Sequence, residues 1–461
     1  MKSANTLETK KLERTDAILS CLVKDAAPKA KTELRLQLLE AAASRIGGFD
    51  LSAFQKQFTI KPAKLVGQLV DDARSVVQSI NDCGIHPALA LSALTRETLD
   101  EAERRTSGAY HTDFRLALHL ARHSERRLKP DMKVIDPACG AGILLAAVSV
   151  VACGSDRILA SEWIRNCVYA ADLSPLALRG TLIALSTFTD DLDALTAMRA
   201  RWRVQDSLLV PEGEWAALAP GGFDLVIANP PWEKVKLSRH EYSKANGEMR
   251  HYGKSYSEES LAGYENARSE KAIHASQLVQ RYPALASGEP DLYVAFTELS
   301  LKLTRAGGSC SLIVPAGLIR SLNTRHLRAE LMAESETLEF TVMENRARHF
   351  AIDTRFKFLL VNYVKAAQSS VSCTKIGLVH ANASDDQVIA SGAVNLPVKL
   401  LTKLRPDLTL PEVRTVEEWQ LFKKMQENGT PQQDPGSPWF PALCREVDMT
   451  HGRRYTNGPF N

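Results

Sequence analysis

The feature that most constrains this chain is an apolar run that ends in two consecutive prolines. Residues 223–228 read Phe-Asp-Leu-Val-Ile-Ala, which is typical of a buried strand, and Asn229-Pro230-Pro231-Trp232 follows directly. Neither proline donates a ladder hydrogen bond, so the strand must end in a stiff loop. Such a loop can hold the Asn229 amide and the Pro230 carbonyl side by side as acceptors, next to the Trp232 ring. This arrangement suits a planar group with an exocyclic NH2, and the alternative is a proline-stiffened surface loop.

Length and periodicity indicate several domains. At 461 residues the chain is longer than one ordinary domain. Residues 1–105 carry apolar positions three and four apart and are expected to form a helical N-terminal domain. Between 106 and 365 apolar strands alternate with helices, which predicts an α/β fold with a Rossmann-like doubly wound sheet. The expected strands are residues 133–136, 167–171, 201–204, 224–228, 309–314, 338–342 and 356–364. The last two lie close together in sequence, which predicts an antiparallel hairpin at one edge.

Composition narrows the class of protein. The hydrophobic and charged fractions, 44% and 24%, are those of a globular protein. The net charge of +3 neither demands nor excludes nucleic acid, so a bound polyanion would need a local basic face. No apolar run approaches the length of a membrane span, so we expect a cytoplasmic protein without a membrane partner. The eight cysteines form no C-x-x-C pair, so we expect no metal site.

A glycine turn lies upstream of the two prolines. Residues 136–142 read Asp-Pro-Ala-Cys-Gly-Ala-Gly between a predicted strand and an apolar helix. Glycines allow a positive φ and a close approach of the backbone to a ligand. The spacing is not that of a dinucleotide-binding turn, and no lysine is present for a phosphate loop. Asp172 ends the next predicted strand, where an acidic side chain in an open α/β sheet can accept from ribose hydroxyls. A turn without a ligand is the alternative.

Together, the motifs resemble those of the class I S-adenosylmethionine-dependent DNA adenine methyltransferases. The family's first motif reads Asp-Pro-Ala/Thr-Cys-Gly-Ser/Ala-Gly, and its catalytic motif reads Asp/Asn/Ser-Pro-Pro-Tyr/Phe/Trp. Residues 107–114 resemble the family's Gly-x-Tyr-Tyr/Phe-Thr-Pro, with His111 replacing an aromatic residue and Asp113 replacing the proline. Asp113 can still cap the helix that follows. With the cofactor motif first, the order is the gamma arrangement.

Downstream segments extend the resemblance to roughly residues 105–425. Residues 289–296 and 305–315 resemble the family's helix, Gly-Gly turn and fifth strand, and Asp291 opens that helix. Residues 344–358 resemble the hairpin region of large restriction-modification and phage-defence methylases, which include Eco57I-like, BREX-like and DISARM-like enzymes. By this resemblance residues 106–365 form the methyltransferase domain, with an insertion at 233–288. Residues 366–461 form a C-terminal extension in which a target-recognition region could begin.

The resemblance implies S-adenosylmethionine as the methyl donor. The residues implied to bind it are Tyr110, Thr112, Asp136, Ala138, Gly140, Gly142, Asp172 and Asp206. Asp172 would accept from the ribose, and Asp206 from the exocyclic amine of the cofactor adenine. For Asp206, an acid in an ordinary turn is the alternative interpretation.

The resemblance also implies a reaction. Asn229, Pro230, Pro231 and Trp232 form the implied catalytic set, with the amide and carbonyl oxygens holding the two hydrogens of an adenine amine. The adenine must leave the duplex, and an aromatic ring can offset part of the unstacking by stacking on it. The residues expected to bind substrate are Trp232, Phe350, Lys234 and Lys236. A core role for Phe350, and a solvated helical insertion for the lysine-containing segment, are open alternatives.

The expected function is therefore site-specific methylation of adenine in double-stranded DNA, within a restriction-modification or phage-defence system. The alternatives are a protein-glutamine or ribosomal RNA-guanine amino-methyltransferase, and a catalytically silent subunit that binds S-adenosylmethionine. In relatives of this type a target-recognition domain follows the catalytic one, and this sequence stops where such a domain would start. We therefore expect a specificity or defence-complex partner subunit, or a further C-terminal part.

Overall fold

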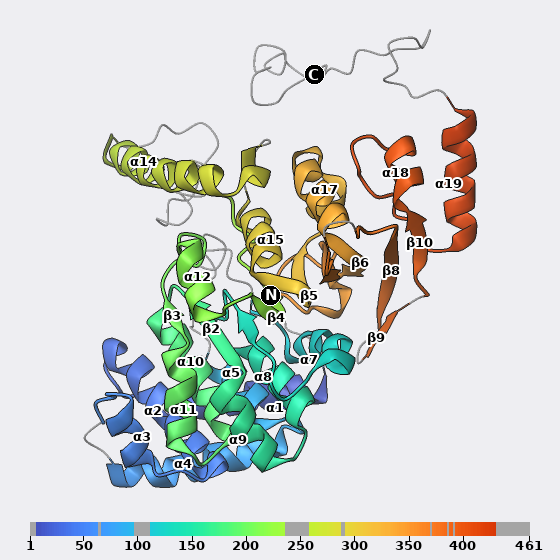
Figure 1. The fold of residues 1–461 in the computed structure, drawn as a ribbon. Helices are drawn as coiled ribbons and strands as arrows, with labels where there is room; N and C mark the ends of the chain where they lie inside the picture. The colour runs from blue at the N-terminus through green and yellow to red at the C-terminus, as the bar shows by residue number, and fades with distance from the viewer. Residues whose placement is uncertain are drawn as a thin grey trace, which may run out of the picture. The chain divides into compact units, whose positions relative to one another are not determined.

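The computed structural model describes residues 6–62, 66–95, 111–235, 258–286, 291–368, 371–384, 387–390 and 392–429. The chain divides into two compact units, residues 1–410 and 411–461. The first unit is built on one mixed β-sheet (Figure 1). The described part of the second unit contains helix α19 (Val416–Asn428), whose N-cap Thr415 accepts from Glu418 N.

The sheet has ten strands among the described residues, in the order β10-β8-β6-β7-β5-β4-β1-β2-β3, with β9 paired to β8. Their bounds are β1 Val134–Asp136, β2 Val168–Asp172, β3 Arg203–Val204, β4 Phe223–Ala228, β5 Thr304–Pro315, β6 Ser335–Glu344, β7 Lys357–Lys365, β8 Lys375–Ser384, β9 Gln387–Ala390 and β10 Val394–Pro397. Neighbours from β3 through β5 pair in parallel, while β7 runs antiparallel between β5 and β6. This order confirms the predicted α/β, doubly wound fold with an antiparallel pair.

The sheet continues beyond the pair that was expected at its edge. Strand β8 pairs in parallel with β6, and β10 pairs antiparallel with β8, so β6 and β7 are internal strands. No strand was expected after residue 366, although β8 forms a local hairpin with β9 as well as its parallel pair with β6. Both predicted domain boundaries, near residues 105 and 365, fall within the first unit, and the division into domains stays a prediction.

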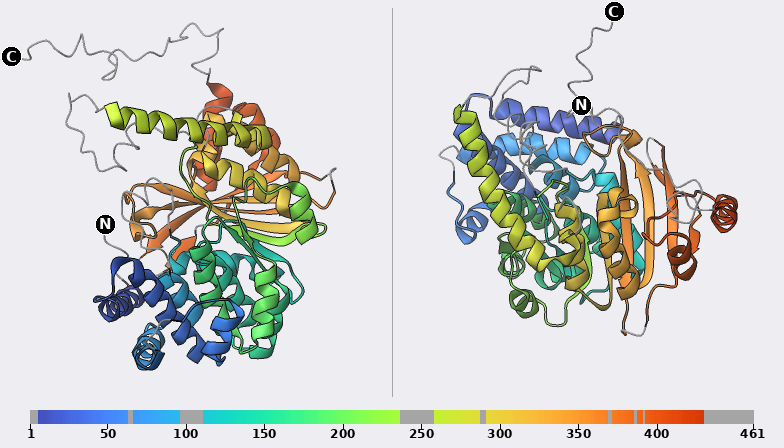
Figure 2. Two further views of the ribbon diagram at one scale, coloured as in Figure 1. Left: turned by 90° about the vertical axis from the view of Figure 1, so that its left-hand side faces the viewer. Right: turned by 90° about the horizontal axis from the view of Figure 1, so that it is seen from above.

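Helices cover both faces of the sheet (Figures 1 and 2). Helices α15 and α17 pack on one face, and α7, α8, α9 and α10 on the other, with the N-terminal helices α2 and α5 packed beyond α10. Their bounds are α1 Leu7–Leu22, α2 Pro28–Gly47, α3 Leu51–Gln57, α4 Val66–Asp82, α5 Pro87–Thr95, α7 Phe114–Ser124, α8 Ile143–Cys153, α9 Arg157–Asn166, α10 Pro175–Leu185, α11 Leu192–Ala200, α12 Glu212–Leu218, α14 Glu258–Arg281, α15 Leu292–Leu303, α16 Gly317–Arg320, α17 Arg325–Glu334 and α18 Val398–Leu404. Since α8 is covered on all sides, it is apolar all round.

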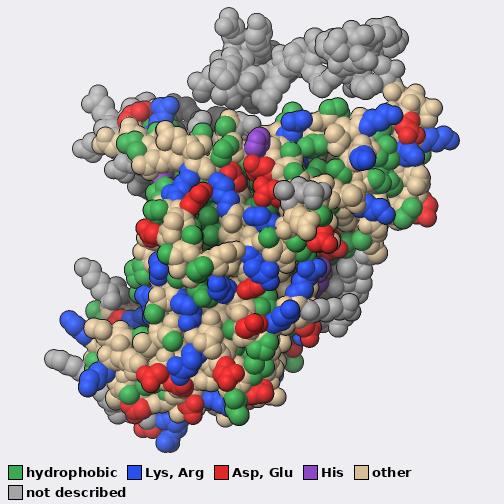
Figure 3. Space-filling model, in the orientation of Figure 1, with side chains coloured by type: hydrophobic (Ala, Val, Ile, Leu, Met, Phe, Trp, Pro, Cys, Tyr) green, Lys and Arg blue, Asp and Glu red, His purple; other side chains and the backbone are tan. Residues whose placement is uncertain are grey.

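Charge is mixed on the face of the protein shown in Figure 3. Lysine and arginine side chains lie among aspartate and glutamate there, without a continuous stripe of one sign. The described helices include none with the length and apolar character needed to cross a membrane.

Candidate functional site

The glycine turn after β1 is fixed by hydrogen bonds from three directions. Asp136 Oδ1 accepts from Ala138 N at 3.0 Å, and Gly140 N donates to Asp172 Oδ2 at 2.8 Å. Thr181 Oγ1 on α10 donates to Gly140 O at 2.8 Å. Gly142 has a φ of 77°, and a Cβ there would meet Thr181 Cγ2 at 2.6 Å, so this turn needs glycine at that position. The backbone of the turn is therefore held in place by its neighbours.

Asp136 is almost fully buried at the carboxyl end of β1. Burial raises the pKa of its carboxyl group well above the usual range, the hydrogen bond from Ala138 N opposes this, and the charge of Asp172 adds to it. Asp172 itself is half-buried at the end of β2, and its Oδ1 accepts from Ser174 N at 2.9 Å. Both oxygens of this carboxylate thus take part in fixing the backbone, Oδ2 at Gly140 and Oδ1 at Ser174.

Asp206 follows β3 and is tied to helix α14. Its Oδ1 accepts from Leu208 N at 3.0 Å, and its Oδ2 lies 2.9 Å from His274 Nε2. Directly after the same helix, Tyr282 donates from its hydroxyl to Leu208 O at 2.9 Å. The described part of the predicted insertion, residues 258–286, therefore packs against the loop that carries Asp206. Sequence analysis did not single out His274, because a lone histidine on a helix gives no local signal.

A pocket of about 480 Å³, open to solvent, lies between the glycine turn and the end of β4. Its lining joins Asp136, Ala138 and Gly140 to Thr112 and Asn229, so five of the residues predicted from sequence surround one space. The lining also includes Ser92, Ala93, His111, Cys139, Ala141, Ile143 and Leu144. Ser92 and Ala93 were not predicted, because helix α5 carries no motif. Asp172 and Asp206 lie outside this lining.

Asn229 lies at the pocket end of β4 in a fixed orientation. Its Nδ2 donates to Thr112 Oγ1 at 3.0 Å, and its Oδ1 is buried. Thr112 precedes Asp113, the N-cap of α7, whose Oδ1 accepts from Arg115 N at 2.9 Å. The replacement of the family's proline by Asp113 thus preserves the start of the helix. Tyr110 and Lys236 lie outside the described residues.

Trp232 lies in an aromatic cluster. Its Nε1 donates to Ile313 O at 3.3 Å, which fixes the ring beside β5. Phe356 stacks on it at 5.6 Å with an interplanar angle of 17°, and Phe350 meets its edge at 4.9 Å. Phe350 is only 3% exposed and also packs on Phe358, whereas Phe356 is 37% exposed. Phe350 is therefore a core residue here, and Phe356 is the ring that reaches solvent.

Asn345 holds the loop that carries these phenylalanines. Its buried amide donates to Phe350 O at 2.9 Å and accepts from Phe350 N at 3.0 Å. Its backbone N–H donates to Phe356 O at 2.9 Å. The motif at residues 344–346 therefore acts through the loop conformation, and not through a contact of its own with the pocket. Two residues after Trp232, exposed Lys234 pairs by an antiparallel bridge with Asp291, the N-cap of α15.

His349 is a buried histidine in the same loop, and neither of its ring nitrogens has a hydrogen-bond partner in the described structure. Burial lowers its pKa to about 4; the charge of Asp113 opposes this, while Arg115 and His119 add to it. The unfolded chain binds a proton near pH 6.5, so it takes up more protons than the folded protein as the pH falls.

We therefore expect the free energy of unfolding to decrease by about 2 kcal/mol between pH 7 and pH 5 on account of His349. His349→Leu should remove this part of the pH dependence, which urea unfolding at the two pH values measures. His123→Leu, at an exposed position on α7, is the matched control and should keep the slope. An unchanged slope in His349→Leu would show that this histidine does not cause the acid sensitivity.

Part of the chain matches the model of a known family. The model of the Eco57I restriction-modification methylase family matches residues 262–350, which run from α14 to the loop after β6. No curated protein matches the chain.

Three solved structures illustrate the similarity in fold. A provisionally assigned class I S-adenosylmethionine-dependent methyltransferase from Listeria monocytogenes is 14% identical, with a TM-score of 0.45, over 81% of this chain and 93% of that chain. The type IIG restriction endonuclease BpuSI is 15% identical, with a TM-score of 0.49, over 88% of this chain and 46% of that chain. A chain of a type I restriction-modification system is 14% identical, with a TM-score of 0.48, over 91% of this chain and 95% of that chain.

The strand order describes the whole sheet, whereas the family match describes residues 262–350 alone. The order β3-β2-β1-β4-β5-β7-β6, with β7 antiparallel, describes the whole sheet around the pocket. The family match covers the segment that carries α14, α15, β5 and β6. The chain therefore has the fold of the class I S-adenosylmethionine-dependent methyltransferases, and its residues 262–350 are similar to the Eco57I restriction-modification methylases, which implies S-adenosylmethionine as the cofactor.

Proposed function

We propose that this protein methylates the exocyclic N6 amine of adenine in double-stranded DNA, as the modification enzyme of a restriction-modification or phage-defence system. One observation carries the proposal: the Asn229 amide lies at the end of β4, in the same pocket as the glycine turn. Asn229 of the Asn-Pro-Pro-Trp motif and several residues of the cofactor motif thus line one space, as transfer between two bound molecules requires.

The groups that could hold the cofactor are divided between the pocket and two carboxylates outside its lining. The turn at residues 138–142 would lie against the methionine part, Asp172 would accept from the ribose hydroxyls, and Asp206 would accept from the adenine amine. When bound, S-adenosylmethionine supplies an electrophilic methyl group on its sulfonium. The protein supplies the fixed turn, since Gly140 and Gly142 allow the backbone to approach a ligand closely.

Asn229 and Pro230 would activate the amine. The lone pair of an aryl amine is delocalised into the ring, so the amine is a poor nucleophile. Asn229 Oδ1 and the Pro230 carbonyl would accept its two hydrogens and turn the lone pair away from the ring plane. Thr112 fixes the amide by accepting from Asn229 Nδ2, which sets the orientation of Oδ1. Because the amine would take the methyl group directly, no covalent intermediate with the protein would be needed, and the methylated nitrogen would release one hydrogen as a proton to water.

Phe356 is our candidate for stacking on the flipped base, in place of the sequence prediction Phe350. It lies flat against Trp232 and exposes over a third of its surface, so a base could extend the stack or displace this ring. We expect Phe356→Ala to raise the KM for DNA about 10-fold, because base stacking on an aromatic side chain contributes about 1–3 kcal/mol.

Steady-state kinetics on Phe356→Ala and Phe350→Ala test this assignment. Phe350→Ala removes a core ring, so it should lower the free energy of unfolding by about 3–5 kcal/mol. We therefore expect the increase in KM for DNA in Phe356→Ala and the loss of stability in Phe350→Ala. A KM for DNA in Phe356→Ala equal to that of the wild type would argue against base stacking by this residue.

The proposed partners are double-stranded DNA and a specificity or defence-complex subunit, with the protein in the cytoplasm. Exposed Lys234, next to the motif, is a candidate for a phosphate contact. Transfer of a labelled methyl group to DNA, RNA or protein by the purified chain, with and without cell extract, identifies the substrate class. We expect label in DNA as N6-methyladenine at one sequence motif; label in RNA or protein alone would overturn the proposal.

A further inference from the structure

We infer that helix α5 forms one wall of the cofactor pocket, with Ala93 contacting the methionine part and Ser92 positioning the glycine turn. The inference rests on the proposed cofactor site and assigns a role to the N-terminal helices that no motif indicates. Its starting observation is that Ser92 and Ala93 line the same pocket as Thr112, Asp136 and Asn229.

Ser92 completes the hydrogen bonding of the glycine turn. Its Oγ donates to Ala141 O at 2.8 Å, and the serine is only 2% exposed. Gly140 O accepts from Thr181 on α10, and Gly140 N donates to Asp172 after β2. The turn is thus held by side chains from three elements, one of which is α5. A buried carbonyl that loses its donor is costly, so Ser92 contributes to the shape of the turn.

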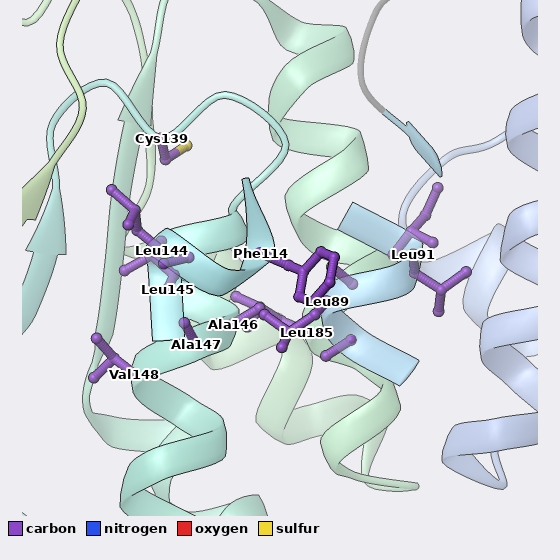
Figure 4. Packing of buried hydrophobic residues seen from close by; sticks show 14 of the residues in the cluster. Leu89, Leu91, Phe114, Cys139, Leu144, Leu145, Ala146, Ala147, Val148 and Leu185 are labelled. Carbon is purple, nitrogen blue, oxygen red and sulfur yellow. The ribbon is translucent and has the colours of Figure 1, made fainter. Parts of the chain in front are cut away.

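Helix α5 is attached firmly enough to serve as a wall. Figure 4 shows Leu89 beside Leu185 of α10 and near apolar side chains of α8, whereas Leu91 points away from them; both leucines belong to the same buried core. A Cβ on Gly180 would meet Thr95 Oγ1 at 2.8 Å, so the end of α5 lies directly on the backbone of α10.

A buried ion pair joins α10 to α2, which packs against α5. Arg179 Nε donates to Glu40 Oε1 at 2.7 Å, and the Glu40 side chain is fully buried. The same guanidinium donates to Glu33 at 2.6 and 2.9 Å. Breaking such a pair leaves a buried charge uncompensated, so the N-terminal helices are held to the cofactor-side helix α10.

The lining identifies which end of the cofactor α5 would touch. Asn229 lines the pocket, whereas Asp172 and Asp206, which would hold the ribose and the adenine, do not. The pocket therefore corresponds to the methionine end. Ala93 is half-buried and has the smallest side chain after glycine, so it leaves space there that a larger residue would fill.

Thiol labelling of Ala93→Cys in the full chain tests the wall directly. N-ethylmaleimide should modify the introduced thiol, and saturating S-adenosylmethionine should slow this at least about 10-fold, with the peptide resolved by mass spectrometry. Ala17→Cys on the exposed face of α1 is the matched control and should react at one rate in both conditions. A thiol at position 93 that reacts equally with and without cofactor, or does not react, overturns the inference.

Cofactor affinity gives a second readout that does not depend on catalysis. By isothermal titration calorimetry, Ala93→Leu should bind S-adenosylmethionine at least about 30-fold more weakly, whereas Ala17→Leu should match the wild type. Ala93→Leu that is folded by thermal melting and binds like the wild type overturns the inference, and a misfolded variant leaves the decision to the labelling. Failure of the wild type to bind the cofactor would instead overturn the proposed function.

Discussion

Replacing Asn229 by alanine is expected to slow methyl transfer by about 10²–10³-fold, the cost of removing one preorganised group that stabilises a transition state. The amide is fixed by its donation to Thr112 Oγ1, so Oδ1 is oriented before the substrate arrives. In the alanine variant the target amine has no such acceptor, so the lone pair of the amine stays delocalised in the adenine ring. Single-turnover rates with DNA and bound cofactor measure the effect, and sequencing of methylated DNA from expressing cells should show loss of the modified motif.

Cofactor binding separates this role from damage to the pocket. Asn229→Ala should bind S-adenosylmethionine within about 3-fold of the wild type, because the cofactor contacts lie on the glycine turn. Thr112→Val keeps the side-chain shape but removes the acceptor for Asn229 Nδ2. It should reduce the rate about 10-fold, in keeping with about 1 kcal/mol for one hydrogen bond. A wild-type rate in Asn229→Ala would refute the assignment of this amide.

The sequence predicted the strands of the sheet well where consecutive strands pair with each other or are connected by a helix. The strands from β1 to β7 were expected close to where they occur, since each is an apolar run bounded by turn residues. Strands β8, β9 and β10 were missed: β8 joins the sheet by pairing with β6, with β7 between them in the sequence, while β9 and β10 pair with β8 locally. The antiparallel pair was expected from sequence, and its internal position was not.

The residues of the candidate site also fall into two groups, those that belong to a sequence motif and those that do not. Thr112, Asp136, Gly140 and Asn229 carry motifs, and the structure brings them to one pocket. Residues without a motif could not be found from sequence. Ser92, Ala93 and His274 belong to this second group, since each enters through tertiary packing. Phe356 lies in the segment 344–358 that resembles the family, but only its packing on Trp232 singles it out. Phe350 shows the opposite case, because its place in the sequence suggested a base contact while its burial places it in the core.

Replacing Asp172 by alanine is expected to weaken S-adenosylmethionine binding about 100-fold, because hydrogen bonds to a charged group contribute about 1.5–3 kcal/mol each. The variant loses the proposed ribose contact and also the acceptor for Gly140 N, so the glycine turn loses one of the side-chain hydrogen bonds that hold it. Asp172→Asn keeps one acceptor and should show a smaller loss.

Asp156→Ala is the matched control for this prediction. Asp156 accepts from Ile158 N and Leu159 N at the start of α9, away from the proposed ribose contact. This variant should lose about 1 kcal/mol of stability without a change in cofactor affinity. Calorimetric titration of the folded variants decides the question. If Asp172→Ala binds the cofactor as tightly as Asp156→Ala does, the carboxylate at the end of β2 does not hold the ribose, and the cofactor must lie differently in this fold.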